Sequence, residues 1–218
     1  MTKLLTLCAA ALLAGLYTAP AEEFPLQFKT LDAKDVMRFP GGYGSYGQIR
    51  PNKPEGLKAE PKAASKRPLY GKIGENMAGA EVSLFRLDES QGDGKGYDQI
   101  IVDLNQNGDL TDDPVAGRVT TGEERNYPTN GPEFAVFGPM ESTKTINGHH
   151  PVYFAQAYIY ARMYRTQPEQ PNAYLGQVRF KAGWYLETSV TLGSLKKKVG
   201  LYDANSNQQL GELAKCQT

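Results

Sequence analysis

Residues 97–113 read YDQIIVDLNQNGDLTDD, a β-type apolar run that passes directly into a loop of acidic and amide residues. Isoleucine, valine and tyrosine favour strands, whereas asparagine, aspartate and glycine favour turns. The preceding residues 88–96 are rich in glycine and aspartate, and residues 82–87 form a second β-type run. We therefore predict an antiparallel hairpin with a long loop, formed by residues 82–87 and 97–102.

Further short β-type runs follow at the close spacing that is typical of all-β folds. They comprise residues 133–137, 151–164, 175–181, 183–192 and 196–202. The alanines in 151–164 would also tolerate a helix, and in 175–181 we expect Val178 and Phe180 to face inward. Because no segment carries a long helical period, the sequence predicts a mainly β fold, either an antiparallel β-sandwich or an open barrel with long loops.

The N-terminal segment has the features of a secretory signal: a basic start at Lys3, an apolar run over residues 4–16 and a small-x-small end at Ala19–Ala21. We predict three regions: a signal peptide over 1–21, an extended Gly/Pro-rich basic arm over 22–67, and a β-rich domain over 68–218. The expected localisation is secreted or periplasmic. No membrane span is expected in the processed chain, because no second apolar run approaches about 18 residues.

The charges balance overall but are unevenly distributed. The chain has 24 Lys and Arg against 24 Asp and Glu, so its formal net charge is zero. Binding to nucleic acid is therefore not expected, since such binding depends on neutralising phosphates. Residues 88–113 nevertheless hold eight acids and a single lysine, Lys95. Eight carboxylates so close together repel one another unless something neutralises them, and a cation is the simplest candidate.

The loop that starts at Asp103 has the spacing of a calcium-binding loop. Oxygen-bearing side chains recur at alternate positions, a glycine stands at the sixth position, and Leu110 can anchor the loop to a core. The twelfth position, where an EF-hand has a bidentate glutamate, is Pro114, and the incoming element is a strand. The same residues would also suit a polar turn with no ion. The predicted Ca²⁺ ligands are Asp103, Asn105, Asn107 and Asp112, with Asp109 through its carbonyl and Asp113 as a rival to Asp112.

A weaker copy of this loop occurs one hundred residues later. It repeats the acidic and amide pattern but has Gln208 in place of the glycine, so it is either a second ion site or a structural turn. Two matches of this kind are compatible with an internal duplication. The candidate metal ligands in the second loop are Asp203, Asn205, Asn207 and Glu212.

These segments resemble a group of uncharacterised secreted bacterial proteins of planctomycete and verrucomicrobia type. The resemblance covers PLYG at 68–71, DES at 88–90, YDQIIVD at 97–103 and LYDANSN at 201–207. It implies calcium-dependent, EF-hand-like loops and no established activity.

The sequence therefore predicts a secreted β-rich domain with structural calcium loops and an interaction or envelope-associated role. Its partner would be an extracellular protein or glycan, and its oligomeric state is left open. The alternative is a carbohydrate-binding module or a glycoside hydrolase that uses acidic-loop carboxylates, with Trp184, Tyr185, Tyr158 and Tyr160 as a stacking platform. No catalytic motif is present, and the adjacent His149 and His150 are expected in an exposed turn.

Overall fold

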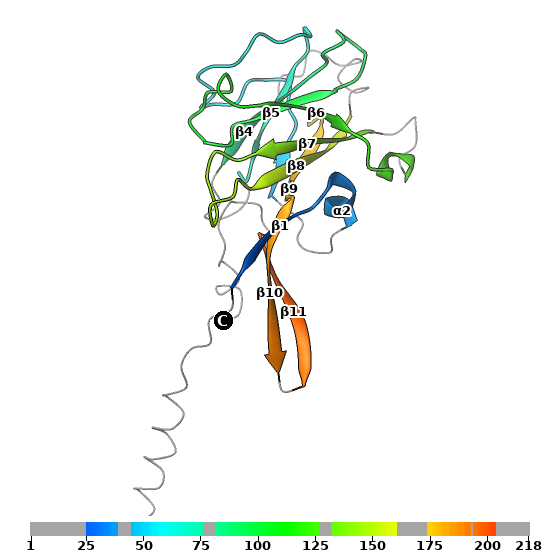
Figure 1. Cartoon of the computed structure of the whole chain (residues 1–218). Coiled ribbons are helices and arrows are strands. Elements are labelled where there is room, and N and C mark those ends of the chain that lie inside the picture. Colours follow the sequence, from blue (N-terminus) through cyan, green and yellow to red (C-terminus); the bar gives the residue numbers. More distant parts are fainter. Residues whose placement is uncertain are drawn as a thin grey trace, which may run out of the picture.

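The structure is a computed structural model that describes residues 25–38, 45–75, 82–126, 132–160, 174–192 and 194–203. Two antiparallel sheets make up the fold (Figure 1), which confirms the predicted mainly β class. The first sheet has eight strands in the order β2-β9-β8-β7-β6-β5-β4-β3, and the second has three in the order β1-β10-β11.

The strands of the large sheet are β2 (Ser45–Gln48), β3 (Leu69–Ile73), β4 (Ser83–Asp88), β5 (Gln99–Val102), β6 (Val115–Val119), β7 (Glu133–Glu141), β8 (Val152–Ile159) and β9 (Gly176–Ala182). The small sheet contains β1 (Gln27–Thr30), β10 (Trp184–Leu192) and β11 (Leu195–Tyr202). A short helix, α2 (Ala33–Arg38), and one turn of 3₁₀ helix, η1 (Glu123–Asn126), complete the described elements.

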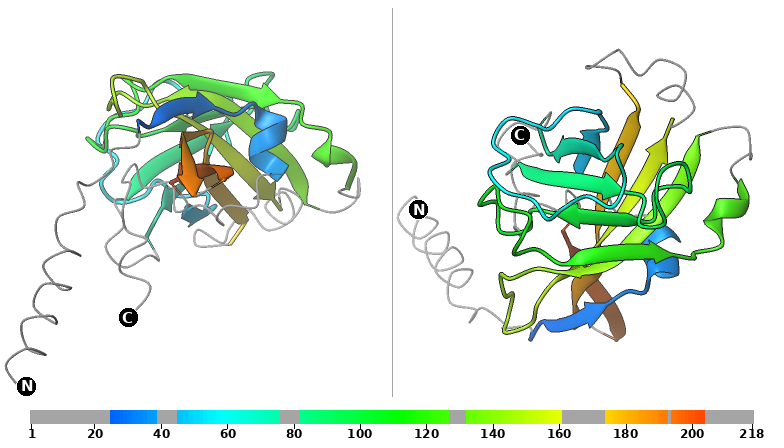
Figure 2. Two further views of the ribbon diagram at one scale, coloured as in Figure 1. Left: turned by 60° about the horizontal axis from the view of Figure 1, so that its bottom comes forward. Right: turned by 90° about the horizontal axis from the view of Figure 1, so that it is seen from above.

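The large sheet curls until its two edge strands meet, so the architecture is a nearly closed barrel (Figure 2). Arg50, just after β2, and Tyr70 of β3 exchange two backbone hydrogen bonds of 2.8 Å. The Gly74 N–H also donates to the Tyr46 carbonyl at 3.2 Å. Gly47 and Gly71 lie at this closure, where a side chain on either residue would meet the backbone of the opposite strand.

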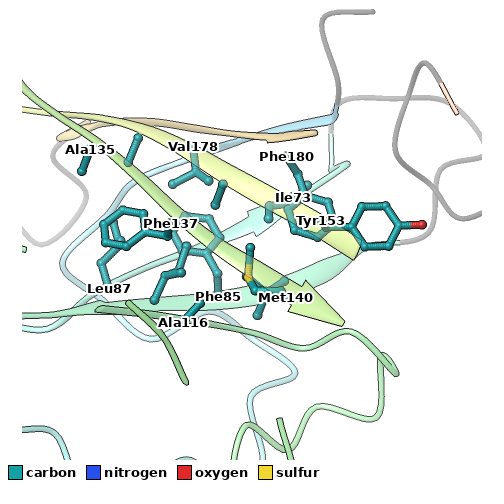
Figure 3. Close-up of a cluster of buried hydrophobic side chains, with 14 of the residues drawn as sticks. Ile73, Phe85, Leu87, Ala116, Ala135, Phe137, Met140, Tyr153, Val178 and Phe180 are labelled. Carbon is teal, nitrogen blue, oxygen red and sulfur yellow. The ribbon is translucent and has the colours of Figure 1, made fainter. Parts of the chain in front are cut away.

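The core fills the inside of the curled sheet (Figure 3). Val178 and Phe180 are buried in it, which confirms their predicted orientation. The Tyr153 ring stacks on that of Phe180 with centroids 4.9 Å apart. A smaller cluster on the outer face forms where α2 places Val36 against Phe134 and its apolar neighbours.

Most strands lie where the sequence predicted them. The predicted hairpin is formed by β4 and β5, which pair antiparallel from Phe85↔Val102 to Asp88↔Gln99. Residues 152–159 are a strand, so the strand reading of 151–164 holds for them, while residues 161–164 lie outside the described part. The predicted runs at 133–137, 175–181, 183–192 and 196–202 correspond to β7, β9, β10 and β11.

The predicted extended arm over 22–67 differs from what its described residues show. They contain β1, α2 and β2, and single apolar residues such as Val36 and Ile49 are fully buried. Burial in this segment comes from isolated apolar side chains, and the segment also contacts acidic loops that are distant in the sequence. Local composition reveals neither feature. The predicted signal segment, residues 1–21, lies outside the described residues. No helix in the described part of the chain is long and apolar enough to span a membrane.

Candidate metal site

The predicted calcium loop follows the end of β5, and its first residue is hydrogen-bonded to β4. The Asp103 N–H donates to the Leu84 carbonyl of β4 at 2.9 Å, so the pairing with β4 continues into the loop. Leu104 and Leu110 are buried, and Leu110 thus has the anchoring position expected for it. Gly108 has a φ of 82°, a conformation that favours glycine, as expected at the sharp turn.

Asp103 closes the first half of the loop with both carboxylate oxygens. Its Oδ1 accepts the Asn107 N–H at 3.1 Å, and its Oδ2 accepts the Gly108 N–H at 2.9 Å. The side chain is 1% exposed. Each carboxylate oxygen can accept more than one contact, so these bonds orient the carboxylate without exhausting its capacity to bind a cation.

The following side chains continue this pattern. Asn105 Oδ1 accepts the Asn107 N–H at 3.0 Å, and Asn107 Oδ1 accepts the Asp109 N–H at 2.6 Å. The amide groups of Asn105 and Asn107 then converge on one oxygen, because both donate to Asp112 Oδ2, at 3.1 and 2.8 Å. Three of the predicted ligands therefore meet on one side of the loop.

Asp109 turns toward the next residue instead of toward these three. Its Oδ1 accepts both the N–H and the hydroxyl of Thr111, at 2.8 and 2.6 Å. The two hydrogen bonds from Thr111, helped by the charge of Lys58, hold the pKa of Asp109 below its usual value. The Asp109 carboxylate is therefore ionised, and its contribution as a ligand would come through its carbonyl, as predicted.

Asp113 is the least satisfied carboxylate in the loop. Its Oδ1 accepts the Leu104 N–H at 3.1 Å, whereas its Oδ2 is buried and has no hydrogen-bond partner. Burial raises the pKa of Asp113 to about 6; the bond from Leu104 opposes this shift, and the charges of Asp103, Asp112 and Asp109 add to it. A buried carboxylate that lacks a partner and faces three like charges is costly unless it is protonated or neutralised by a cation.

The loop packs against residues 56–59 of the basic segment. The Lys58 N–H donates to the Gly108 carbonyl at 2.7 Å, and the Leu110 N–H donates to the Ala59 carbonyl at 2.9 Å. The Lys58 ammonium bonds to the Asn107 carbonyl at 2.6 Å and supplies one positive charge at the loop. A Cβ on Gly108 would lie 2.5 Å from the Gly56 carbonyl oxygen, so the glycine also permits this close approach. Sequence reasoning missed the contact because about fifty residues separate its two sides.

Four of the eight acids in 88–113 lie outside the 103–113 loop, at the end of β4 and in the connection from β4 to β5, where each accepts hydrogen bonds from backbone N–H groups. The expected negative field is therefore divided between two places, and Asp88 also lies 3.7 Å from the Arg86 guanidinium. The bonds are Ala64 and Ser65 to Asp88, Gly94 and Gly96 to Glu89, Lys66 to Asp93, and Ser90 to Asp98.

The second predicted loop is described only at its first residue. Asp203 is 1% exposed and lies near Tyr153. Burial raises the Tyr153 pKa, and the charge of Asp203 raises it further. The other predicted ligands, Asn205, Asn207 and Glu212, lie outside the described residues. β5 pairs with β4 and β6, whereas β11 pairs with β10 in the other sheet, so strand pairing in the described part gives no support to a duplication.

The two histidines and Trp184 are all engaged in contacts within the fold. His150 Nδ1 bonds to the Ser142 carbonyl at 2.9 Å, and His149 stacks on Phe28 with ring centroids 4.7 Å apart. Trp184 is fully buried and also stacks on Phe28, with ring centroids 5.6 Å apart. A buried indole offers no face to a sugar, so Trp184 takes no part in the stacking platform considered for a carbohydrate-active protein.

Within the described ranges, no group of three or more His, Cys, Asp or Glu side chains is arranged to hold a metal ion. An ion in the 103–113 loop would thus need amide and carbonyl oxygens as well as carboxylates. Calcium accepts such mixed sets of oxygen ligands, whereas transition metals favour nitrogen and sulfur. Comparison of the chain with protein-family models, curated proteins and solved structures found no match.

Proposed function

We propose that the 103–113 loop binds calcium, and that the ion stabilises a secreted β domain with an interaction or envelope-associated role. The observation that carries this proposal is the buried, unpartnered Oδ2 of Asp113 among three further carboxylates. A divalent cation would supply the missing partner and remove the repulsion. Extracellular calcium is a suitable candidate because extracellular modules work with weak affinities of about 10⁻⁴–10⁻³ M.

The ligand chemistry supports calcium with a modest affinity. Asp112 and its rival Asp113, together with Asp103, are the candidate carboxylate ligands, although no three of these side chains are arranged around one point in the described loop. The amides of Asn105 and Asn107 can rotate to present oxygen instead of nitrogen to an ion at the place where they now contact Asp112. Pro114 stands where a bidentate glutamate would close an EF-hand. Lys58 competes for the same negative field. Both features favour a weak site that fills only at extracellular calcium levels.

We expect calcium to raise the thermal unfolding midpoint relative to EDTA. An ion that binds only the folded chain stabilises it by about 1.4–2.7 kcal/mol at ten to one hundred times its dissociation constant. For a chain of this size the midpoint would rise by roughly 3–10 °C. Magnesium at equal concentration should produce a smaller shift, because it dehydrates reluctantly and demands stricter geometry. The measurement is a thermal melt followed by circular dichroism.

The variant that locates the site is Asp112→Asn, because Asp112 is exposed and its loss leaves the backbone bonds of the loop intact. Asp103→Ala is less suitable, since Asp103 also holds two N–H groups of the loop. Asp93→Asn is the matched control: it removes one exposed acid from a neighbouring loop. The calcium shift should disappear in Asp112→Asn and persist in Asp93→Asn. An equal melting midpoint in calcium and EDTA for the unaltered chain would overturn the proposal.

In EDTA, Asp113→Asn is expected to leave the melting midpoint unchanged or to raise it at neutral pH. The substitution removes a buried carboxylate that faces three like charges, and it keeps an oxygen for the Leu104 N–H. Calcium should raise the melting midpoint of Asp113→Asn little or not at all. The variant should therefore be at least as stable as the unaltered chain in EDTA and less stable than it in calcium. Destabilisation in EDTA together with a full calcium shift would show that Asp113 is structural and not a ligand.

A further inference from the structure

The β10–β11 hairpin extends beyond the other described strands and helices (Figure 1). β1 pairs with β10 only from Trp184 to Glu187, so residues beyond Glu187 have no strand partner on that side in the described chain. No described strand pairs with β11 on the side away from β10. We call residues Leu195 to Leu201 of β11, together with the paired residues Leu186 to Leu192 of β10, the ribbon. Such a two-stranded ribbon has no core of its own.

The two faces of the ribbon differ in chemistry. Directly paired residues of an antiparallel pair lie on the same face, and side chains alternate between faces along each strand. Leu186 pairs with Leu201 and Thr188 pairs with Val199, so Leu195, Val199 and Leu201 share a face with the buried Leu186. The face of the hairpin that packs on the core at Leu186 thus continues along the ribbon beyond the last core residue.

This continuation exposes apolar side chains that are large enough to matter. Leu195, Val199 and Leu201 are 59%, 42% and 40% exposed. They are three of the nine large hydrophobic residues that are exposed among the described residues, and they fall within seven consecutive positions. An exposed apolar stripe of this kind marks an interaction surface more often than scattered single residues do.

Three consecutive lysines lie on the same strand. Lys196 and Lys198 project from the face opposite the apolar stripe, and Lys197 lies within the stripe. Lys198 forms a 3.0 Å ion pair with Glu187. A lysine within an apolar surface can keep its ammonium in a polar layer while its hydrocarbon stem lies along the apolar one. The ribbon therefore joins an apolar face to a concentrated positive charge.

We propose that the ribbon is a docking surface for an anionic lipid bilayer. The apolar face would enter the boundary between headgroups and acyl chains, and the lysines would reach the lipid phosphates, as in other peripheral amphipathic elements. A protein strand added to the β11 edge fits less well, because successive lysines on an edge strand oppose edge-to-edge pairing. The proposed surface lies outside the 103–113 loop and does not depend on calcium.

The test is co-sedimentation of the chain with vesicles of phosphatidylcholine containing phosphatidylglycerol, in EDTA, with pure phosphatidylcholine vesicles for comparison. The N-terminal residue of the purified protein is first determined by mass spectrometry, so that the unaltered chain and all variants are compared with the same N-terminus. We expect binding to the anionic vesicles that declines with added salt. Lys196→Gln with Lys197→Gln should weaken the partition coefficient about 30-fold, since each lysine near an anionic surface contributes about fivefold. Lys34→Gln with Lys62→Gln is the control of equal charge.

A second pair of variants examines the apolar face. Leu195→Thr with Val199→Thr keeps strand-forming residues and should weaken binding roughly tenfold, with little dependence on salt. Val115→Thr, on the exposed strand β6, is its control. Equal binding to both kinds of vesicle, or equal losses in the ribbon and control variants, would overturn the proposal. So would a dimer, measured by light scattering, that disappears in Leu195→Thr with Val199→Thr, because the ribbon would then bind a second copy.

Discussion

Gly71→Ala is expected to lower the free energy of unfolding by about 3 kcal/mol or more, whereas Gly117→Ala should leave it unchanged or raise it slightly. A Cβ on Gly71 would lie 2.2 Å from the Gln48 carbonyl oxygen and 2.4 Å from the Phe85 ring. Both neighbours are fixed, one as backbone and the other as a fully buried side chain. The barrel would have to reopen between β2 and β3 to make room.

Gly117 is a matched control because it is also a strand glycine. A Cβ there would meet nothing within 4 Å, so alanine adds only its better strand propensity. The measurement is guanidinium unfolding followed by circular dichroism, with midpoint and slope reported for both variants. If Gly71→Ala does not fold, its circular dichroism spectrum will lack the strand signal that Gly117→Ala retains. That difference also supports the predicted destabilisation. Equal stability of the two variants would contradict the barrel closure at β2 and β3.

The strands that the sequence predicted are those with an alternating pattern or a compact β-type run in their own residues. β9 alternates regularly, and β5 is a compact run of Ile100, Ile101 and Val102. β3 and β6 were missed because they contain glycine and charged residues, as in LYGKI and VAGRV. Their strand conformation comes from the neighbours with which they pair, and pairing between distant segments leaves little trace in local composition.

The candidate site was predictable to a similar degree. The loop could be located from Asp103, Asn105, Asn107 and Gly108, since a tight loop of alternate oxygen-bearing residues is a local pattern. The packing of Lys58 and Ala59 on this loop could not be predicted, because it depends on contact between segments that are far apart in the sequence. The unpartnered oxygen of Asp113 also emerged only from burial, as Asp112 and Asp113 are equivalent in the sequence.

Arg86→Met is expected to cost about 3–5 kcal/mol of stability at neutral pH. Arg86 is 4% exposed, its Nη1 donates to Glu60 at 3.2 Å and to the Pro61 carbonyl, and its Nη2 lies 3.7 Å from Asp88 Oδ2. Removing the guanidinium leaves two largely buried carboxylates without this cation. Replacing one member of a buried charged group is costly because the partners keep their desolvation without compensation.

The matched control is Arg118→Met. Arg118 pairs with Glu133 at the same 3.2 Å distance, but the two side chains are 39% and 24% exposed. Water and salt screen such a pair, so its loss should cost at most about 1 kcal/mol. The double variant Arg86→Met with Glu60→Gln should recover part of the stability lost in Arg86→Met, because it removes one of the uncompensated charges. Equal losses of stability in Arg86→Met and Arg118→Met would show that burial does not strengthen the interactions of Arg86.

The pH dependence gives an independent check on this network. Burial alone would raise the Glu60 pKa, but hydrogen bonds and charges from Lys53 and Arg86 outweigh it and hold the pKa below its ordinary value. A carboxyl whose pKa is lower in the folded chain stabilises it at neutral pH, and that stabilisation is lost as the pH falls through the folded-state pKa. Without Arg86 the Glu60 carboxylate keeps Lys53 as its partner but its pKa rises, so protonation relieves the loss of Arg86 at a higher pH. The stability deficit of Arg86→Met, measured by guanidinium unfolding, should therefore be largest near about pH 7 and should shrink toward about pH 4. A deficit that stays constant over this range would mean that Arg86 acts through packing and not through its charge.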